Sequence, residues 1–183
     1  MRVISGSAKG IQLQAVPGSG TRPISDRVKE AVFNILAGAI VESRVLDLFA
    51  GTGSVGIEAL SRGAEQAVFV EKHPKAIATI RANLRRTTLE AEARVVRADV
   101  FKFLASTPQP FDLIYIAPPQ YQGLWSKTLL ALDAAPEWLD PMGLAIVQIF
   151  PKEFEPLSLS SLQLTEQRKY GSTLLCFYEP LPR

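Results

Sequence analysis

Three glycines stand in the spacing Gly-x-Gly-x-x-Gly within residues 47–56, which read DLFAGTGSVG. A predicted strand, residues 44–49, precedes them and a predicted helix, residues 54–62, follows. In that context the spacing is typical of a loop that binds a nucleotide cofactor. The first glycine would permit a tight turn, the second would let a ligand approach the backbone, and the third would let the helix lie close to a strand. The three glycines are Gly51, Gly53 and Gly56.

Two carboxylates indicate which cofactor this loop would bind. Glu71 ends the second predicted strand, from where a carboxylate reaches ribose hydroxyls in doubly wound folds. Asp47 would repel the phosphates of a dinucleotide such as NAD, but it would pair with the ammonium and sulfonium groups of S-adenosylmethionine. A buried carboxylate needs such a counter-charge or a set of hydrogen-bond donors. The sequence therefore favours S-adenosylmethionine, with backbone N–H groups as the alternative partners of Asp47.

Two further polar residues lie at the starts of predicted helices. Asp99 follows the third predicted strand, where its side chain could accept a hydrogen bond from the adenine amino group or could simply cap the next helix. His73 is the single histidine and precedes Pro74. A capping or loop role is favoured for His73 over general-base catalysis.

The elements that would carry these residues alternate between short apolar strands and amphipathic helices. This pattern predicts an α/β fold with a mostly parallel sheet covered on both faces. The expected strands are residues 44–49, 67–70, 94–97, 111–116 and 144–149, and the expected helices are residues 54–62, 74–86, 100–105 and 125–132. Residues 164–169 and 173–179 predict a C-terminal antiparallel hairpin. Residues 2–5 and 11–16 predict a small N-terminal hairpin appendage.

The bulk composition fits one domain. The chain has 183 residues, of which 47% are apolar and 21% are charged. We expect a hairpin and loop in residues 1–20, a leading helix in 21–40 and a catalytic core in 44–183. The apolar stretches are shorter than the roughly 20 residues of a membrane helix, and the first residues lack the apolar centre of a signal peptide. One cysteine, Cys176, and the lack of a Cys and His cluster predict a cytoplasmic protein without disulfide or metal.

Positive charge is concentrated near the N-terminus, although the formal net charge of the chain is only +2. Residues 1–30 hold five Arg or Lys residues against two acids, and a second group of arginines falls within residues 81–97. Such a cluster is more often a solvated face than a phosphate-binding surface. Charge alone therefore leaves nucleic-acid binding open.

The residues described so far resemble a family of bacterial methyltransferases that modify guanine N2 in 16S ribosomal RNA of the small subunit. The resemblance covers nearly the whole chain, and its most specific part is residues 21–36, TRPISDRVKEAVFNIL. It implies the Rossmann-like fold of class I methyltransferases, S-adenosylmethionine as cofactor, and ribosomal RNA or the small subunit as partner. The implied cofactor contacts are Asp47, the three glycines, Glu71 and Asp99. The implied RNA contacts are Lys9, Arg22, Arg27 and Lys29.

The reactive motif departs from that family. After the fourth strand its members carry Asp or Asn, then Pro-Pro, then Tyr or Phe, whereas residues 117–121 read APPQY. The usual acid accepts an N–H bond from the guanine amine, and the side chain of Ala117 cannot do so. Asp112 cannot replace it, because it lies about 16 Å away on the opposite face of the strand. The candidate catalytic residues are Ala117, Pro118, Pro119 and Tyr121.

The aromatic of the motif is expected to stack on the flipped base. Tyr121 stands one position late, and Trp125 is a second candidate, with core packing as the alternative for each. Two functions follow. The first is an S-adenosylmethionine-dependent RNA methyltransferase. The second is a catalytically impaired family member that serves as an RNA- or ribosome-binding module. The sequence does not predict the oligomeric state.

Overall fold

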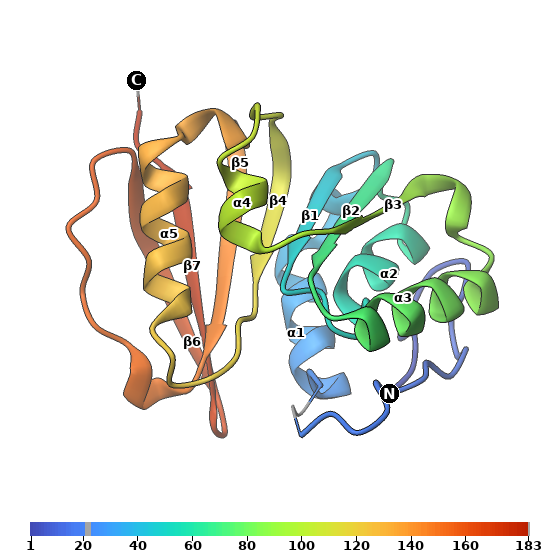
Figure 1. Ribbon diagram of the computed structural model, residues 1–183. Helices are drawn as coiled ribbons and strands as arrows, with labels where there is room; N and C mark the ends of the chain where they lie inside the picture. Colours follow the sequence, from blue (N-terminus) through green and yellow to red (C-terminus); the bar gives the residue numbers. More distant parts are fainter. Residues whose placement is uncertain (21–22, 183) are drawn as a thin grey trace.

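Seven strands form a single sheet in the computed structural model, which describes residues 1–20 and 23–182. The strands are β1 (Arg44–Leu48), β2 (Gln66–Glu71), β3 (Ala93–Arg97), β4 (Phe111–Ile116), β5 (Leu139–Ile149), β6 (Leu162–Tyr170) and β7 (Thr173–Pro180). Their order across the sheet is β3-β2-β1-β4-β5-β7-β6 (Figure 1). β1 to β5 run parallel, whereas β7 pairs antiparallel with both β5 and β6. The predicted parallel sheet with a C-terminal antiparallel hairpin is confirmed.

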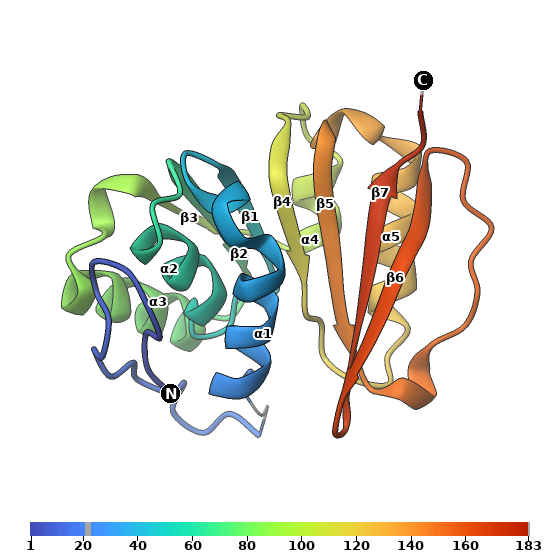
Figure 2. The same ribbon diagram turned by 180° about the vertical axis from the view of Figure 1, so that it is seen from behind.

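Helices cover both faces of this sheet (Figures 1 and 2). The helices are α1 (Asp26–Leu36), α2 (Ser54–Ser61), α3 (Pro74–Thr87), α4 (Val100–Leu104) and α5 (Leu124–Ala134), with 3-10 turns η1 (Ala37–Ile40), η2 (Glu90–Glu92), η3 (Pro136–Trp138) and η4 (Pro151–Glu153). Residues of α1, α2 and α3 share one core cluster with the sheet, and residues of α4 and α5 share another. The central strands β1, β2 and β4 are therefore buried between two layers of helices, which explains their nearly continuous apolar sequences, whereas the edge strand β6 is mostly exposed.

The fifth strand begins earlier than the sequence predicts, at Leu139 instead of residue 144. Residues 139–143, LDPMG, resemble a loop because they contain proline and glycine. The pairing with β4 shifts register between Phe111 and Leu113, as at a β-bulge. A Cβ on Gly143 would lie 2.8 Å from a Leu139 side-chain carbon and 3.0 Å from the carbonyl oxygen of Phe111. The bulge therefore requires glycine at this position.

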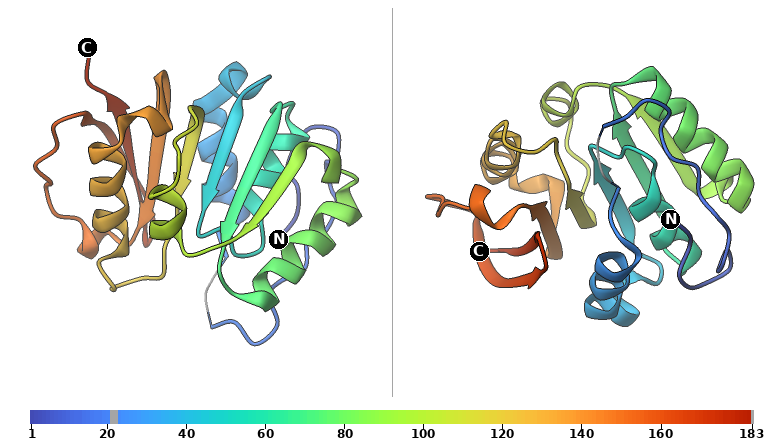
Figure 3. Two further views of the ribbon diagram at one scale, coloured as in Figure 1. Left: turned by 45° about the horizontal axis from the view of Figure 1, so that its top comes forward. Right: turned by 90° about the horizontal axis from the view of Figure 1, so that it is seen from below.

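The N-terminal segment, residues 1–14, is part of the core and not an appendage. It forms one isolated antiparallel bridge, between Arg2 and Gln12, in place of the two predicted strands. Val3, Ala8 and Leu13 are buried in the cluster that also contains α1, α2 and α3. Figure 3 shows the segment passing over α2 and α3. The chain reversal of the predicted hairpin is present, but the prediction that it is an appendage was wrong.

The strand order reverses between β1 and β4, which are direct neighbours with Leu48 opposite Ile116. Ligands of doubly wound folds bind outside the carboxyl ends of the strands at such a point. The glycine loop follows β1 and residues 117–121 follow β4, so the two predicted functional segments meet at this edge. The helices that the structure describes lack the length and apolar character of a membrane span.

Candidate functional site

The glycine loop turns sharply between β1 and α2. Gly51 has φ +58° and Gly53 has φ +78°, both in the left-handed region that favours glycine. A Cβ on Gly56 would lie 2.3 Å from the ring of Phe69 in β2, so only glycine lets α2 pack this closely on the sheet. The predicted steric roles of Gly51 and Gly56 are confirmed. Gly53 differs, because its Cβ would point at Phe69 and Ile80 in the core, 3.3 Å from each, and not toward a ligand.

Asp47 is a buried carboxylate just below this loop. It is 2% exposed, and its Oδ2 accepts a hydrogen bond of 3.1 Å from the backbone N–H of Gly56. Burial raises the pKa of Asp47 to about 8, and the Gly56 bond offsets only part of that shift. A backbone N–H alone therefore leaves the ionised carboxylate poorly stabilised. A cationic ligand group in the loop would supply the missing counter-charge, so the site fits a cofactor with an ammonium or sulfonium.

Glu71 holds the glycine loop to the end of β2. Its Oε2 accepts from the N–H of Gly51 at 3.0 Å, and its Oε1 accepts from the N–H groups of Lys72 and His73 at 2.8 and 3.0 Å. Glu71 as a whole is 8% exposed. Both oxygens retain lone pairs, since a carboxylate offers about four acceptor sites. Glu71 is thus oriented by the backbone, and its capacity to accept from ribose hydroxyls stays a prediction.

Asp99 and His73 begin helices, as the sequence predicts. Asp99 Oδ1 accepts from the N–H groups of Phe101 and Lys102 at 2.9 and 3.3 Å and so caps α4. The capping role is confirmed, whereas the adenine contact remains a prediction. His73 is the N-cap residue of α3, but its side chain makes no capping hydrogen bond.

Lys29 is not an RNA contact, because its side chain is fully buried. The ammonium donates to the carbonyl oxygen of Arg2 at 2.5 Å and to Ser54 Oγ at 3.0 Å, and it lies 3.4 Å from Glu58 Oε2. The predicted RNA-binding role of Lys29 was therefore wrong. Lys29 precedes Val32 by three positions and Phe33 by four, so it shares their buried face.

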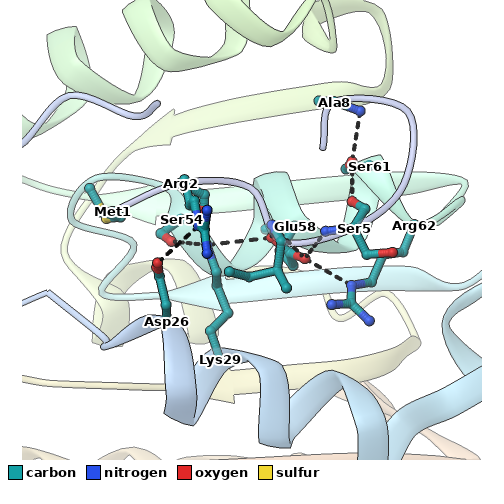
Figure 4. Close-up of polar contacts among 12 residues, drawn as sticks. Met1, Arg2, Ser5, Ala8, Asp26, Lys29, Ser54, Glu58, Ser61 and Arg62 are labelled. Atoms are coloured by element: carbon teal, nitrogen blue, oxygen red, sulfur yellow. Dashed lines mark hydrogen bonds and ion pairs between the residues drawn. The ribbon is translucent and has the colours of Figure 1, made fainter. Parts of the chain in front are cut away.

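Glu58 and Asn83 are structural residues that the sequence reading missed. Glu58 accepts from the N–H groups of Ile4 and Ser5 at 2.9 and 3.1 Å, and it also pairs with Arg62 (Figure 4). Asn83 accepts from the N–H of Gln14 at 2.7 Å and donates to the carbonyl oxygen of Thr52 at 3.0 Å. Both side chains are fully buried. A charged residue within an apolar helix was the available signal for Glu58.

These contacts tie the N-terminal segment to the glycine loop. Lys29 contacts Ser54, the first residue of α2, and Asn83 bonds Thr52 and Gln14 together. Thr52 also donates to the sulfur of Met1 at 3.5 Å. The outer side of the loop is thus fixed by α1, α3 and the N-terminal segment. Its position is preorganised before any ligand binds.

Two of the remaining basic candidates lie on the protein surface. Lys9, in the N-terminal segment, and Arg27, at the start of α1, are both exposed. Their side chains are accessible to a phosphate backbone, and their role in RNA binding stays a prediction. Arg22 lies outside the described residues.

The segment after β4 presents backbone groups but no acid at its first position. Ala117 and Pro119 are half-buried and Pro118 is buried. Asp112 lies at the other end of β4, where its Oδ2 accepts from the N–H of Arg44 at 2.7 Å. The rejection of Asp112 as a substitute acid is confirmed. The catalytic role of this segment stays a prediction.

The two aromatic candidates have different environments. Trp125 is 3% exposed and stacks on Phe154, so the core-packing alternative is confirmed for it. Tyr121 is 64% exposed and stacks on Phe150, with ring centroids 5.4 Å apart and an interplanar angle of 18°. Its backbone N–H donates to Glu153 at 2.7 Å. The ring of Tyr121 therefore remains accessible to a ligand, and that of Trp125 does not.

Comparison with known proteins gives consistent matches. Residues 1–179 match the family described as Conserved hypothetical protein 95. The "Putative rRNA methyltransferase YlbH" of Bacillus subtilis is 40% identical over 183 residues, 98% of each chain. Ribosomal RNA small subunit methyltransferase D of Escherichia coli K12 is 33% identical, over 98% of this chain and 89% of its own. The solved structure of "Putative methyltransferase yhhF" from Escherichia coli has a TM-score of 0.86 at 33% identity, over 98% of this chain and 97% of its own.

Proposed function

The chain belongs to the Conserved hypothetical protein 95 family, and we propose that it methylates the exocyclic amine, N2, of a guanine in 16S ribosomal RNA of the small subunit. Family membership makes it a methyltransferase with the class I Rossmann-like fold, and S-adenosylmethionine is its cofactor. What we propose is the substrate, 16S ribosomal RNA, and the acceptor atom, guanine N2. Its relatives are named as ribosomal RNA methyltransferases, which supports ribosomal RNA as the substrate.

One observation carries the proposal: the glycine loop after β1 and residues 117–121 after β4 adjoin each other at the switch point of the sheet. The first segment has the buried carboxylate that suits a cationic cofactor. The second has an exposed aromatic side chain, that of Tyr121, and the backbone carbonyls of residues 117 and 118. A methyl donor and a flat base could therefore meet at this edge, which is the geometry that methyl transfer to a base requires.

Four features would hold the cofactor. Asp47 would pair with its positive charge, and the turn at Gly51 and Gly53 would follow its outline. Glu71 would accept from the ribose hydroxyls and Asp99 from the adenine amine. When bound, the cofactor supplies an electrophilic methyl group on a sulfonium. The chain contributes the position of that group relative to the acceptor amine.

The acceptor side relies on the backbone. The guanine amine is a weak nucleophile because its lone pair is delocalised into the ring, and hydrogen bonds from its N–H groups help the nitrogen to become tetrahedral. Carbonyl oxygens at Ala117 and Pro118 would accept these bonds, and Tyr121 would stack on the base. Loss of one side-chain acceptor at Ala117 would cost about 3 kcal/mol of transition-state stabilisation, roughly a hundredfold in rate. The proposed enzyme is therefore slower than one with an acid here.

The direct test is methyl transfer to small-subunit particles that lack the modification. Purified protein is incubated with isotopically labelled S-adenosylmethionine and such particles, and the RNA is digested to nucleosides for mass spectrometry. We expect labelled N2-methylguanosine. Label in a different nucleoside would refute the acceptor, and no label at all, with a relative that has the Asp-Pro-Pro motif active in parallel, would refute the activity.

Ala117 favours a second candidate, in which the chain binds RNA or the ribosome without methylating it. The two functions differ in the response to Ala117→Asp. Activity in the substituted protein alone would support the binding module. Activity in both proteins would support the enzyme.

A further inference from the structure

An aromatic pair, one ring exposed and one half-buried, lies at the carboxyl edge of the sheet. Tyr121, after β4, stacks on Phe150, which directly follows β5. An interplanar angle of 18° with centroids 5.4 Å apart is an offset stack. Phe150 covers one face of the tyrosine ring. Because Tyr121 is 64% exposed, its other face is open to solvent.

This tyrosine has an unfavourable backbone conformation. Its φ is +56°, in the left-handed region that bulky side chains rarely adopt. Such conformations persist where surrounding contacts enforce them, and they concentrate at functional sites. The backbone of Tyr121 is hydrogen-bonded to a carboxylate from a different part of the chain.

Glu153 holds both aromatic residues by their backbones. Its Oε1 accepts from the N–H of Tyr121 at 2.7 Å, and its Oε2 accepts from the N–H of Phe150 at 2.9 Å. Glu153 ends the turn η4, and its own N–H donates to the carbonyl oxygen of Phe150 at 3.0 Å. One half-buried side chain thus links the segment after β4 to the segment after β5.

Core packing does not explain this arrangement. A second stacked pair, Trp125 and Phe154, lies in the adjoining helix and turn, and Trp125 is 3% exposed. The ring of Trp125 is buried in that pair, as expected for a contact that stabilises the core. The Tyr121 ring remains in water, where an aromatic face is available to another flat group.

We propose that Glu153 is a positioning residue that holds Tyr121 and Phe150 as a preformed two-ring platform for the base that the proposed function stacks on Tyr121. This inference rests on the proposed function. Stacking of a base on an aromatic side chain contributes about 5- to 150-fold in affinity. A platform that is fixed before binding retains more of that gain, because less side-chain freedom is lost.

The platform matters more in this chain than in one with an acid after β4. Ala117 offers no side-chain acceptor, so the orientation of the acceptor amine depends on how firmly the base is stacked. A displacement of the base would reduce the rate strongly, since transfer requires an aligned nucleophile. Tyr121 stands one position later than the family motif places its aromatic, and Glu153 fixes it there.

The test compares Glu153→Ala and Phe150→Leu with the control Lys152→Ala, an exposed neighbour on η4. We expect each of the first two substitutions to lower kcat/KM for the RNA substrate by about tenfold or more. The dissociation constant of S-adenosylhomocysteine should stay as in the unsubstituted protein, and the midpoint of thermal unfolding, although lowered by the lost contacts, should stay well above the assay temperature. Glu153→Gln, which keeps one acceptor oxygen, should retain more activity than Glu153→Ala. An unchanged kcat/KM in Glu153→Ala would overturn the inference, as would a parallel loss of cofactor binding.

A second readout separates this inference from the proposed function. Single-stranded RNA containing 2-aminopurine loses fluorescence when that base stacks on an aromatic ring. We expect the unsubstituted protein to quench it and Tyr121→Ala and Glu153→Ala to quench it less. Equal quenching by all three would overturn the platform. A protein that quenches normally but transfers no methyl group would support the platform and refute only the proposed activity.

Discussion

The ammonium of Lys29 and the carboxylate of Glu58 lie 3.4 Å apart, and both side chains have no exposed surface. Through this pair α1 and α2 are joined beneath the N-terminal segment, whose backbone supplies further partners to each group. Breaking a buried ion pair by removing one partner leaves an uncompensated charge. The pair is therefore expected to control the stability of the fold and not the affinity for RNA.

Lys29→Met tests that expectation. Glu58 would lose its buried cation, although Arg62 and two backbone N–H groups remain. We expect the free energy of unfolding, from urea titration, to fall by about 3 kcal/mol. Lys9→Met, on an exposed lysine, should change it by less than about 0.5 kcal/mol. A stable Lys29→Met protein with a weaker salt dependence of RNA binding would contradict the structural role.

Gly56→Ala should disturb the junction of α2 and β2. The new methyl carbon would lie 2.3 Å from the Phe69 ring, which is itself fully buried. Overpacking of this kind costs about 1–3 kcal/mol and would also move the start of α2. We expect weaker binding of S-adenosylhomocysteine by calorimetry and a lower unfolding midpoint. Gly38→Ala, where a Cβ would meet open space, is the control and should change neither.

Cofactor affinity should depend on pH through Asp47. Burial raises the pKa of this carboxyl to about 8 in the free protein, while a bound cation would favour its ionised form. Binding below pH 8 would therefore release a proton. We expect the affinity for S-adenosylhomocysteine to rise between pH 6 and 8, by up to about tenfold per pH unit. Asp47→Asn should bind more weakly and lose this pH dependence. An equally steep dependence in Asp47→Asn would contradict the role of Asp47.

The same carboxyl also affects stability. Its pKa in the folded chain is raised above the ordinary value of 3.8, so the folded state binds the proton more tightly than the unfolded state does. The stabilisation is fully present below that ordinary value and is lost as pH rises toward 8. The free energy of unfolding should change less between pH 6 and pH 8 in Asp47→Asn than in the unsubstituted protein. If the free energy of unfolding changed equally in both proteins, groups other than Asp47 would cause the pH dependence.

Lys9 and Arg27 should each contribute one ionic contact to RNA. Single substitutions by alanine are expected to reduce the slope of log affinity against log salt by about one, with cofactor binding unchanged. Arg168→Ala, on β6 and paired with Glu166, is the control and should leave the slope unchanged. Equal slopes in all four proteins would show that these two residues belong to a solvated face.

Much of the fold could be predicted because its strands are short, apolar and separated by turn-forming residues. The prediction for β4 matches residue for residue, and that for β1 differs by one residue. The beginning of β5 could not be predicted, since a bulged strand that contains Pro141 and Gly143 has the composition of a loop. The depth of the N-terminal segment was missed because its partners, Glu58 and Asn83, are far away in sequence.

Some residues of the candidate site could likewise be predicted from the sequence, and others could not. The glycine loop was predictable because the turn after β1 places Gly51 in the left-handed region and because the close packing of α2 on Phe69 requires glycine at Gly56. Lys29 was misjudged because its charge was given more weight than its spacing from Val32 and Phe33. Glu153 could not be found from the sequence, since its two hydrogen-bond partners come together only when β4 and β5 are placed side by side.

The most direct measurement is a single-turnover time course of labelled methyl transfer from S-adenosylmethionine to unmodified small-subunit particles, with the unsubstituted protein and Ala117→Asp side by side. We predict that the unsubstituted protein labels N2-methylguanosine and that Ala117→Asp transfers as fast or up to about a hundredfold faster. Transfer by Ala117→Asp alone, with none by the unsubstituted protein, would contradict the proposed enzyme and assign the chain to the binding module.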